Sequence, residues 1–288
     1  MTSKSARPMR PLNVGDVVSA GISLLRSNFK TFSGLSIKAA LWFLVPVYGW
    51  ARGIMIYAQI GRMGFQEMRR QPETATQSLR AVEPRLWPFL GIALLVFLIQ
   101  MAVSYALSFA VGIVILPISL VGSAGEAMAV LSALLAFVAQ LVVLGAQMWV
   151  QARLFLWDLI LALEPELEST AAITRSWELT KGSGVRILLT LLVSYLVILP
   201  LYALMIVIPL LVALPFLGSG FLEGGGNEAA VLGILLALLV FLVLAFGVIV
   251  LASPFFQTIK SVLYYDLRSR REGLDIQLRD RPQYPRDL

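Results

Sequence analysis

Three stretches of the chain share one order of residue types: a glutamine, then a base, an aromatic residue and a carboxylate. The base and carboxylate pairs are Arg62 and Glu67, Arg153 and Asp158, and Lys260 and Asp266. Their five- or six-residue spacing lies outside the three- or four-residue spacing at which side chains on one helix meet. The chemistry open to these groups is therefore ion pairing between helices.

We expect the three helix ends to cluster and exchange partners, with Arg153 pairing with Asp266 and Lys260 with Asp158. The alternative is that each base extends separately to water. Polar groups near hydrocarbon need partners or hydration. We therefore expect neighbouring glutamines and one further arginine to join these bases and carboxylates in one cluster. The expected interhelical polar cluster is Arg52, Arg62, Glu67, Gln147, Gln151, Arg153, Asp158, Gln257, Lys260 and Asp266.

The sequence contains no cysteine and no histidine. It therefore offers no disulfide, no thiolate metal ligand and no histidine to carry protons near neutral pH. It also has none of the glycine-rich phosphate-binding motifs or hydrolase nucleophile motifs. We expect no enzyme activity, no cofactor, no metal and no nucleic-acid partner.

The composition is that of an integral membrane protein. Hydrophobic residues make up 58% of the chain and charged residues 14%, with a mean hydropathy of +0.83, outside the range of soluble domains. Four apolar runs exceed the roughly 20 residues that a spanning helix needs. They are 86–121, 127–163, 187–222 and 229–257. We predict an all-α polytopic membrane protein with four full spans.

The distribution of bases predicts the topology. Of the 23 Lys and Arg residues, 22 lie in the stretches 1–38, 62–85, 153–186 and 260–286. The connections 122–126 and 218–228 carry only glutamates as charges. By the positive-inside rule, the basic stretches and both termini are cytoplasmic. We expect a bacterial plasma membrane or internal membrane.

The first apolar segment, residues 35–60, is interrupted by Lys38, Pro46, Gly49 and Arg52. A single kinked span would place its two basic flanks on opposite sides of the membrane. A broken or re-entrant hairpin that turns near 45–50 would satisfy the charge rule, although the segment is too short to cross twice. Both alternatives are kept.

Residues 13–30 and 169–181 read as amphipathic helices at the cytoplasmic interface. The first of these helices could instead pack on the bundle without touching lipid. We expect the basic residues of these segments and of the following span to contact lipid head groups or an acidic partner. These residues are Arg26, Lys30, Arg175, Lys181 and Arg186.

Two long apolar segments carry further signals. In the return helix predicted over 127–161, Gln140, Gln147 and Gln151 share one face, which should look into the bundle or a wet groove. This face could form hydrogen bonds between helices or line a transport path. In the next segment, the prolines at 200, 209 and 215 predict a kink or a break.

The chain reads as a single membrane domain with repeat-like units at 12–72, 73–163 and 168–272 and a cytoplasmic tail at 273–288. The first and third units each contain an interfacial helix followed by a span. The likeness between units lies in pattern more than in identity.

Two motifs resemble a known family. They are the ending SVLYYDLRSRREGLDI from Ser261 to Ile276 and the opening segments Leu12–Asp16 and Leu24–Phe29. These resemble the membrane domain of glycerophosphoryl diester phosphodiesterase, a broad bacterial and archaeal family. The resemblance implies a multi-helix membrane module with cytoplasmic ends. In that family a separate soluble barrel carries the catalytic metal and histidine residues, so the resemblance implies no activity for this chain.

These patterns favour a non-enzymatic membrane module. It would organise lipid or act as an accessory or scaffold subunit of a membrane complex. The alternative function is a small-molecule or lipid transporter or channel, which the repeats and proline-broken helices also favour. The expected partners are membrane lipids and, in addition, a larger membrane protein complex or a second copy of the chain.

Overall fold

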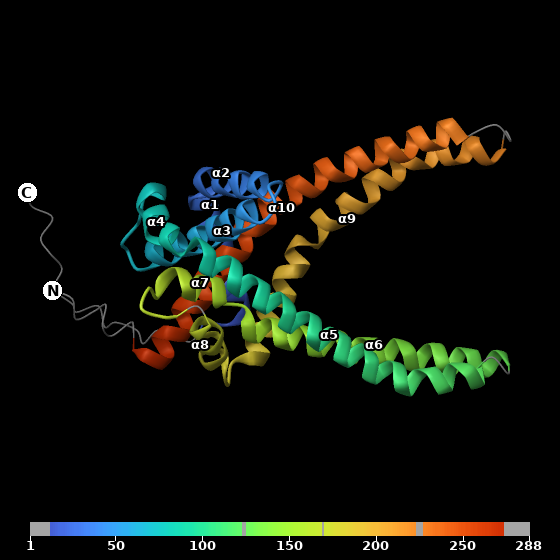
Figure 1. The fold of residues 1–288 in the computed structure, drawn as a ribbon, viewed down its shortest axis with the longest axis horizontal. Helices are drawn as coiled ribbons and strands as arrows, with labels where there is room; N and C mark the ends of the chain where they lie inside the picture. The colour runs from blue at the N-terminus through green and yellow to red at the C-terminus, as the bar shows by residue number, and fades with distance from the viewer. Residues whose placement is uncertain (1–11, 123–124, 169, 223–226, 274–288) are drawn as a thin grey trace, which may run out of the picture. The chain divides into compact units, whose positions relative to one another are not determined.

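The computed structural model describes residues 12–122, 125–168, 170–222 and 227–273, and these are almost entirely helical, with no strand among them. The helices are α1 Val14–Ser27, α2 Phe29–Trp42, α3 Tyr48–Met68, α4 Ala75–Val82, η1 Glu83–Arg85, α5 Leu86–Gly122, α6 Glu126–Leu154, α7 Trp157–Leu163, α8 Ala171–Thr180, α9 Gly184–Leu222 and α10 Asn227–Glu272 (Figure 1). The predicted all-α class is confirmed.

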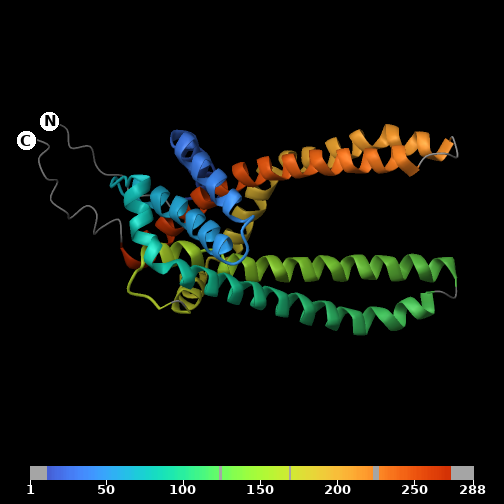
Figure 2. The same ribbon diagram turned by 45° about the horizontal axis from the view of Figure 1, so that its top comes forward.

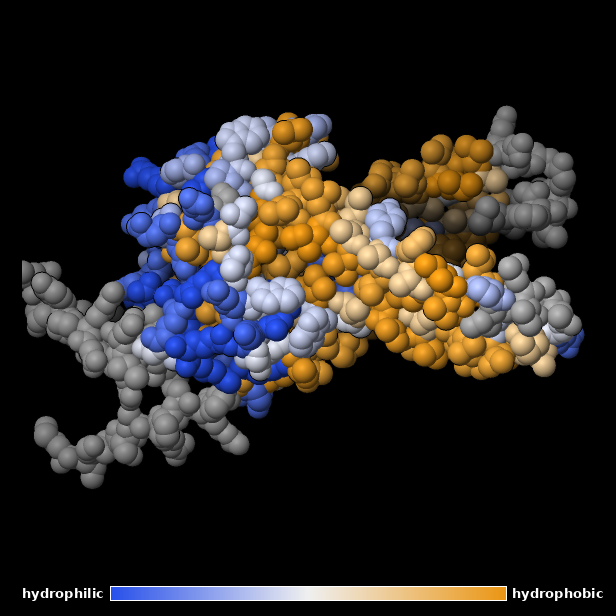
Figure 3. Space-filling model, turned by 60° about the horizontal axis from the view of Figure 1, so that its bottom comes forward, coloured by the Kyte–Doolittle hydropathy of each residue, from blue (hydrophilic) through white to orange (hydrophobic). Residues whose placement is uncertain are grey.

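Four helices, α5, α6, α9 and α10, are long and apolar enough to cross a membrane. At most 17% of each one's most apolar stretch is buried inside the protein. Their surfaces are correspondingly covered with hydrophobic residues (Figure 3). Helices can expose such surfaces to lipid because they satisfy their own backbone hydrogen bonds. The prediction of four spans in a multi-pass membrane protein is confirmed.

The chain forms two compact units. The first unit comprises 1–84 and 189–288, and the second comprises 85–188. The first thus holds α1–α4, α10 and most of α9, while the second holds α5–α8. The repeat-like division at 12–72, 73–163 and 168–272 stays a prediction.

The core of the first unit forms where the end of α10 packs on α1, α2 and α3. Tyr264 is fully buried, with its ring centroid 5.2 Å from that of Phe65. The Ser261 hydroxyl donates to the Gly61 carbonyl at 2.7 Å. A Cβ on Gly64 would lie 2.9 Å from Ser261 Oγ. Small residues on α3 therefore allow the two helices to approach closely.

The first apolar segment is a broken hairpin, so the alternative of a single kinked span is wrong. Helices α2 and α3 pack together and are joined by a turn at 43–47 (Figure 2). With 14 residues, α2 is about 21 Å long, short of the roughly 30 Å hydrocarbon core. Val47 has a φ of 59°, which is strained for a β-branched residue. A Cβ on Gly49 would lie 2.0 Å from the Trp42 carbonyl oxygen.

The amphipathic helix predicted over 13–30 is shorter than expected. Asn13 and Asp16 form a capping box at its start. Helix α1 ends at Ser27, because Asn28 leaves the helical conformation and its side-chain amide donates to the Leu24 carbonyl at 3.3 Å. Lys30 therefore belongs to α2.

The single return helix predicted over 127–161 is also wrong. Helix α6 ends at Leu154 and α7 begins at Trp157. The Ser176 hydroxyl of α8 donates to the Arg153 carbonyl at 2.9 Å and accepts from the Leu156 amide at 3.3 Å. A side chain thus replaces helical hydrogen bonds at the break.

Proline does not break α9, which continues through the prolines at 200, 209 and 215. The helix bends part-way along its course (Figure 1). Of the predicted kink and break, the structure has the kink. A proline inside a helix removes one hydrogen bond and crowds the preceding turn, but it does not necessarily end the helix.

Candidate functional site

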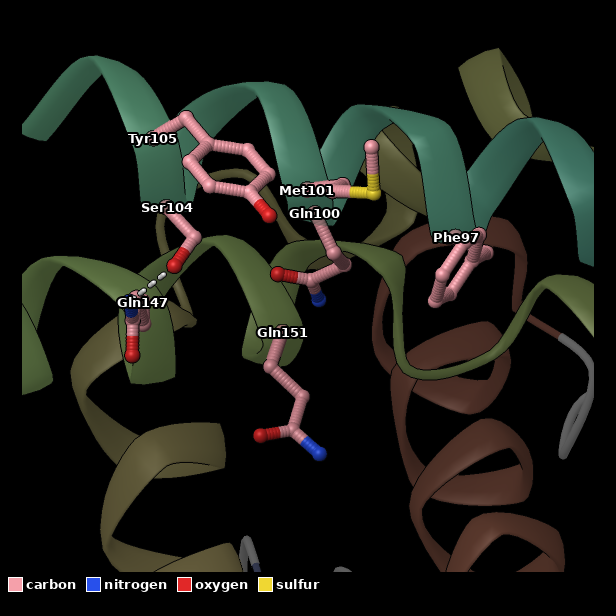
Figure 4. Close-up of a pocket in the computed structure, with 7 residues that line it drawn as sticks. All are labelled: Phe97, Gln100, Met101, Ser104, Tyr105, Gln147 and Gln151. Atoms are coloured by element: carbon pink, nitrogen blue, oxygen red, sulfur yellow. Dashed lines mark hydrogen bonds between the residues drawn. The ribbon is translucent and has the colours of Figure 1, made fainter.

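A polar groove lies between α5 and α6 in the second unit. It has a volume of about 580 Å³. Its lining residues are Phe97, Gln100, Met101, Ser104 and Tyr105 of α5 with Gln147 and Gln151 of α6 (Figure 4). The Gln147 amide donates to the Ser104 hydroxyl at 2.9 Å. Gln100 and Ser104 point from α5 toward α6 (Figure 4).

Helical periodicity builds this groove. Gln100 and Ser104 are four residues apart on α5, as are Gln147 and Gln151 on α6, so each pair lies on one helical face, one turn apart. The two helices pack side by side. Most of their other described residues are apolar, so the polar groups of the groove form a localised patch.

The predicted glutamine face is therefore only partly in the groove. Gln147 and Gln151 line it, whereas Gln140 is exposed and does not. Sequence reasoning missed Gln100, Ser104 and Tyr105. The four-residue spacing of Gln100 and Ser104 inside an apolar run was the signal that could have identified the α5 side.

The groove offers uncharged hydrogen-bonding groups. Amides donate and accept, and hydroxyls do both through one oxygen. The seven lining residues include no acid or base. Within the described ranges, no group of three or more carboxylate side chains lies close enough to hold a metal ion. Such a groove can bind amide, hydroxyl or ester groups that reach it from lipid or from another membrane helix.

The first helix end forms a different ion pair from the one suggested by its sequence. Arg62 donates twice to Glu73, at 2.9 and 2.8 Å, and Gln66 donates to the same carboxylate at 2.8 Å. Burial opposes ionisation of Glu73, but the hydrogen bonds from Arg62 and then Gln66 outweigh it and lower the pKa of Glu73. Glu67 accepts from the Asn28 amide at 3.1 Å.

Arg52 lies near the start of α3. It donates to Glu83 at 2.8 Å, and its guanidinium lies 6.0 Å from the Trp42 ring and 5.8 Å from the Tyr48 ring. The rings lie within the range of a cation–π interaction. The arginine therefore has protein around it, as its depth in an apolar segment requires.

The second helix end divides between two helices. Arg153 belongs to α6 and Asp158 to α7. The Arg153 guanidinium lies 5.2 Å from the Trp149 ring and 5.0 Å from the Trp177 ring. Asp158 is buried. Two tryptophan rings thus lie within cation–π range of this arginine.

At the third helix end, Asp266 pairs with Arg270 at 3.0 Å, four residues further along α10. Gln257 is buried and Lys260 is half-buried. The expected pairs of Arg153 with Asp266 and of Lys260 with Asp158 each join a residue of one unit to a residue of the other. Both pairs stay predictions.

The five basic residues expected to contact head groups differ in their surroundings. Arg26, Lys30 and Lys181 are exposed. Arg175 lies 3.4 Å from Glu164, and Arg186 is half-buried in the first turn of α9. Their contact with lipid or an acidic partner stays a prediction.

Arg85 was missed entirely by sequence reasoning. It donates to the Leu161 carbonyl at 2.8 Å and to the Glu164 carbonyl at 3.0 Å, and it also reaches the Leu167 carbonyl. These carbonyls lie at and beyond the end of α7, where helical acceptors lack partners. Arg85 therefore caps α7 and holds the segment that leads to α8.

No protein-family model, curated protein or solved structure matches this chain.

Proposed function

We propose that this protein is a non-catalytic membrane module, an accessory or scaffold subunit that holds a membrane partner against the groove between α5 and α6. The groove itself carries the proposal. Gln100, Ser104 and Gln147 form a polar patch on an apolar hairpin, where hydrogen bonds between helices stabilise association.

The chemistry of the groove favours a membrane partner over a reacting substrate. Its lining has no charged group and no nucleophile with an adjacent base, so it can hold polar groups but has no means of moving protons. The partner would be another membrane protein or a second copy of this chain. The resemblance to a membrane domain whose family carries catalysis on a separate barrel also supports a non-catalytic module.

Site-specific photo-crosslinking in native membranes tests the proposal. A photoreactive phenylalanine analogue would replace Tyr105, which lines the groove and is 67% exposed. The matched control replaces Ile113, which is 60% exposed on the same helix outside the groove. We expect a discrete protein adduct from position 105 and only lipid adducts from position 113.

A double variant checks that the polar groups provide the contact. Gln100→Leu with Gln147→Leu should weaken the adduct at position 105, because interhelical hydrogen bonds in membranes each contribute about 0.6 kcal/mol. Gln140→Leu, on α6 outside the groove, should leave it unchanged. Equal adducts from 105 and 113, or an adduct insensitive to the double variant, would refute docking at the groove.

The size of the groove favours lipid or small-molecule transport as a second function. A volume of about 580 Å³ falls within the range of small-molecule sites. Reconstituted vesicles with a fluorescent lipid in one leaflet would reveal transport as movement to the other leaflet. Movement abolished by Gln100→Leu with Gln147→Leu, without a protein adduct at position 105, would favour this function over the scaffold.

A further inference from the structure

The turn between α2 and α3 is unusually apolar at the protein surface. Leu44 is 78% exposed, Val47 52% and Trp50 46%. Figures 1 and 2 show this turn at the end of the α1–α3 bundle from which α9 and α10 extend. Clustered exposed apolar side chains mark a surface that contacts membrane or protein. Beside membrane-spanning helices, the expected environment of the turn is lipid.

A cavity of about 250 Å³ lies behind the turn, between α2, α3 and α4. Lys38 of α2 and Arg52 of α3 line it together with the apolar side chains of Leu35, Met55 and Ile56. The cavity is therefore amphipathic, with cations on two helices and an apolar wall between them.

The two cations retain capacity for an anion. Lys38 is exposed and forms no ion pair or hydrogen bond with the described residues. Arg52 uses Nη1 to bind Glu83 at 2.8 Å, and its side chain remains 22% exposed. Arg52 has one carboxylate partner, Glu83, which is 48% exposed.

The depth of these cations matches a head-group region. Lys38 precedes the turn by five residues and Arg52 follows it by five, so each lies about 7 Å from the turn along its helix. An interfacial segment buries its apolar face by about 5 to 10 Å. With the turn in lipid, Lys38 and Arg52 reach the level of the phosphates.

We propose that this cavity binds one anionic phospholipid, with its phosphate between Lys38 and Arg52 and the start of an acyl chain against Leu35, Met55 and Ile56. A free phosphate or phosphorylated solute would use the same two cations. The apolar wall and the lipid-facing turn favour the lipid. This site belongs to the first unit and does not depend on the function proposed for the α5–α6 groove.

Binding is tested with the full-length protein, delipidated in detergent and titrated with phosphatidylglycerol or phosphatidylcholine. We expect at least a tenfold preference for phosphatidylglycerol. Lys38→Gln with Arg52→Gln should remove that preference. Arg80→Gln, an exposed charge on α4 outside the cavity, should keep affinity within twofold. The thermal unfolding midpoint of each variant verifies that it is folded.

A third variant separates the loss of a cation from the loss of its ion pair. Glu83→Gln breaks the Arg52–Glu83 pair but leaves both cations, so phosphatidylglycerol should bind equally or more tightly. Weaker binding by Glu83→Gln, equal losses in Arg80→Gln, or an unchanged preference in the double variant would each overturn the proposal. Displacement of the lipid by millimolar inorganic phosphate would assign the site to a soluble anion instead.

Discussion

At the scale of single residues, the arginines of this chain act as local clamps. Arg62 holds Glu73 from the α3–α4 connection, and Arg85 caps the end of α7 through carbonyl oxygens. Arg153 lies between two tryptophan rings. Each uses the planar, multiply donating guanidinium, which a lysine could not replace geometrically. The repeated base and acid pattern identified Arg62 and Arg153 but not their partners, and it did not include Arg85.

We expect Glu73→Gln to destabilise the protein by about 1 to 3 kcal/mol, because it weakens charge-assisted hydrogen bonds from Arg62 and Gln66. The wild-type contribution should be complete above the ordinary carboxyl pKa of 4.5. It should be lost as pH falls further, through the lowered pKa of folded Glu73. Denaturant unfolding in detergent between pH 3 and 7 measures this.

The matched control is Glu83→Gln, whose partner is Arg52 and whose side chain is 48% exposed. Solvent-exposed pairs contribute about 0 to 1 kcal/mol, so this variant should change stability little. An acid-dependent loss of stability that is the same in wild type and Glu73→Gln would show that Glu73 is not its source.

At the scale of helices, close packing depends on small residues. Helix α3 approaches α10 at Gly61 and Gly64, and the Ser261 hydroxyl donates to the Gly61 carbonyl as well as to the Gln257 carbonyl. In a membrane protein such contacts replace much of the hydrophobic driving force of a soluble core. The interface therefore tolerates little added volume.

We expect Gly64→Ala to destabilise the first unit by about 1 to 3 kcal/mol, because its Cβ would meet buried groups that cannot move away easily. Its Cβ would lie 2.9 Å from Ser261 Oγ and 3.2 Å from Leu24. Thermal unfolding in lipid nanodiscs measures the effect.

Gly34→Ala serves as the control within a helix of the same unit. No atom lies within 4 Å of a Cβ built on Gly34, and alanine favours a helix over glycine by about 0.5 to 1 kcal/mol. This variant should be neutral or stabilising. Comparable destabilisation by both substitutions would attribute the effect to something other than the α3–α10 contact.

At the scale of the whole molecule, an even number of crossings underlies the prediction that both ends of the chain are cytoplasmic. The absence of cysteine permits single-cysteine labelling. We expect an impermeant thiol reagent applied from outside to label cysteines at Ser123 and Ser219 but not at Ser5 or Ser269, because the basic stretches stay inside. Labelling of Ser5 with protection of Ser269 would mean an odd number of crossings.

A double-mutant cycle on Arg153 and Asp266 tests whether the two units meet. If these residues pair, Arg153→Ala and Asp266→Ala should show a coupling free energy of at least about 0.5 kcal/mol in unfolding measurements, whereas independent sites add. Arg270→Ala is a useful reference because Arg270 already pairs with Asp266 within α10. Additive effects of Arg153→Ala and Asp266→Ala would exclude the pair.

The sequence alone determined the class of protein and the number of spans. Both depend on hydropathy summed over about 20 residues, and this sum changes little with any single residue. The interruption of the first segment was also foreseeable, since Pro46 and Gly49 break the helix pattern, but the choice between a hairpin and a kinked span was not. Asn13 is of a residue type that favours the N-cap position, and capping depends only on residues within one helical turn, so the start of α1 can be read from local sequence.

Only the tertiary structure decided which polar groups meet. Glu73 and Glu83 belong to short connections, and nothing local in sequence links them to Arg62 or Arg52. The break after α6 likewise depends on Ser176, twenty residues beyond Leu156. The groove needed both α5 and α6 to bring Ser104 to Gln147. Hydropathy specifies which segments enter the membrane, but partner choice depends on distances set by packing between helices.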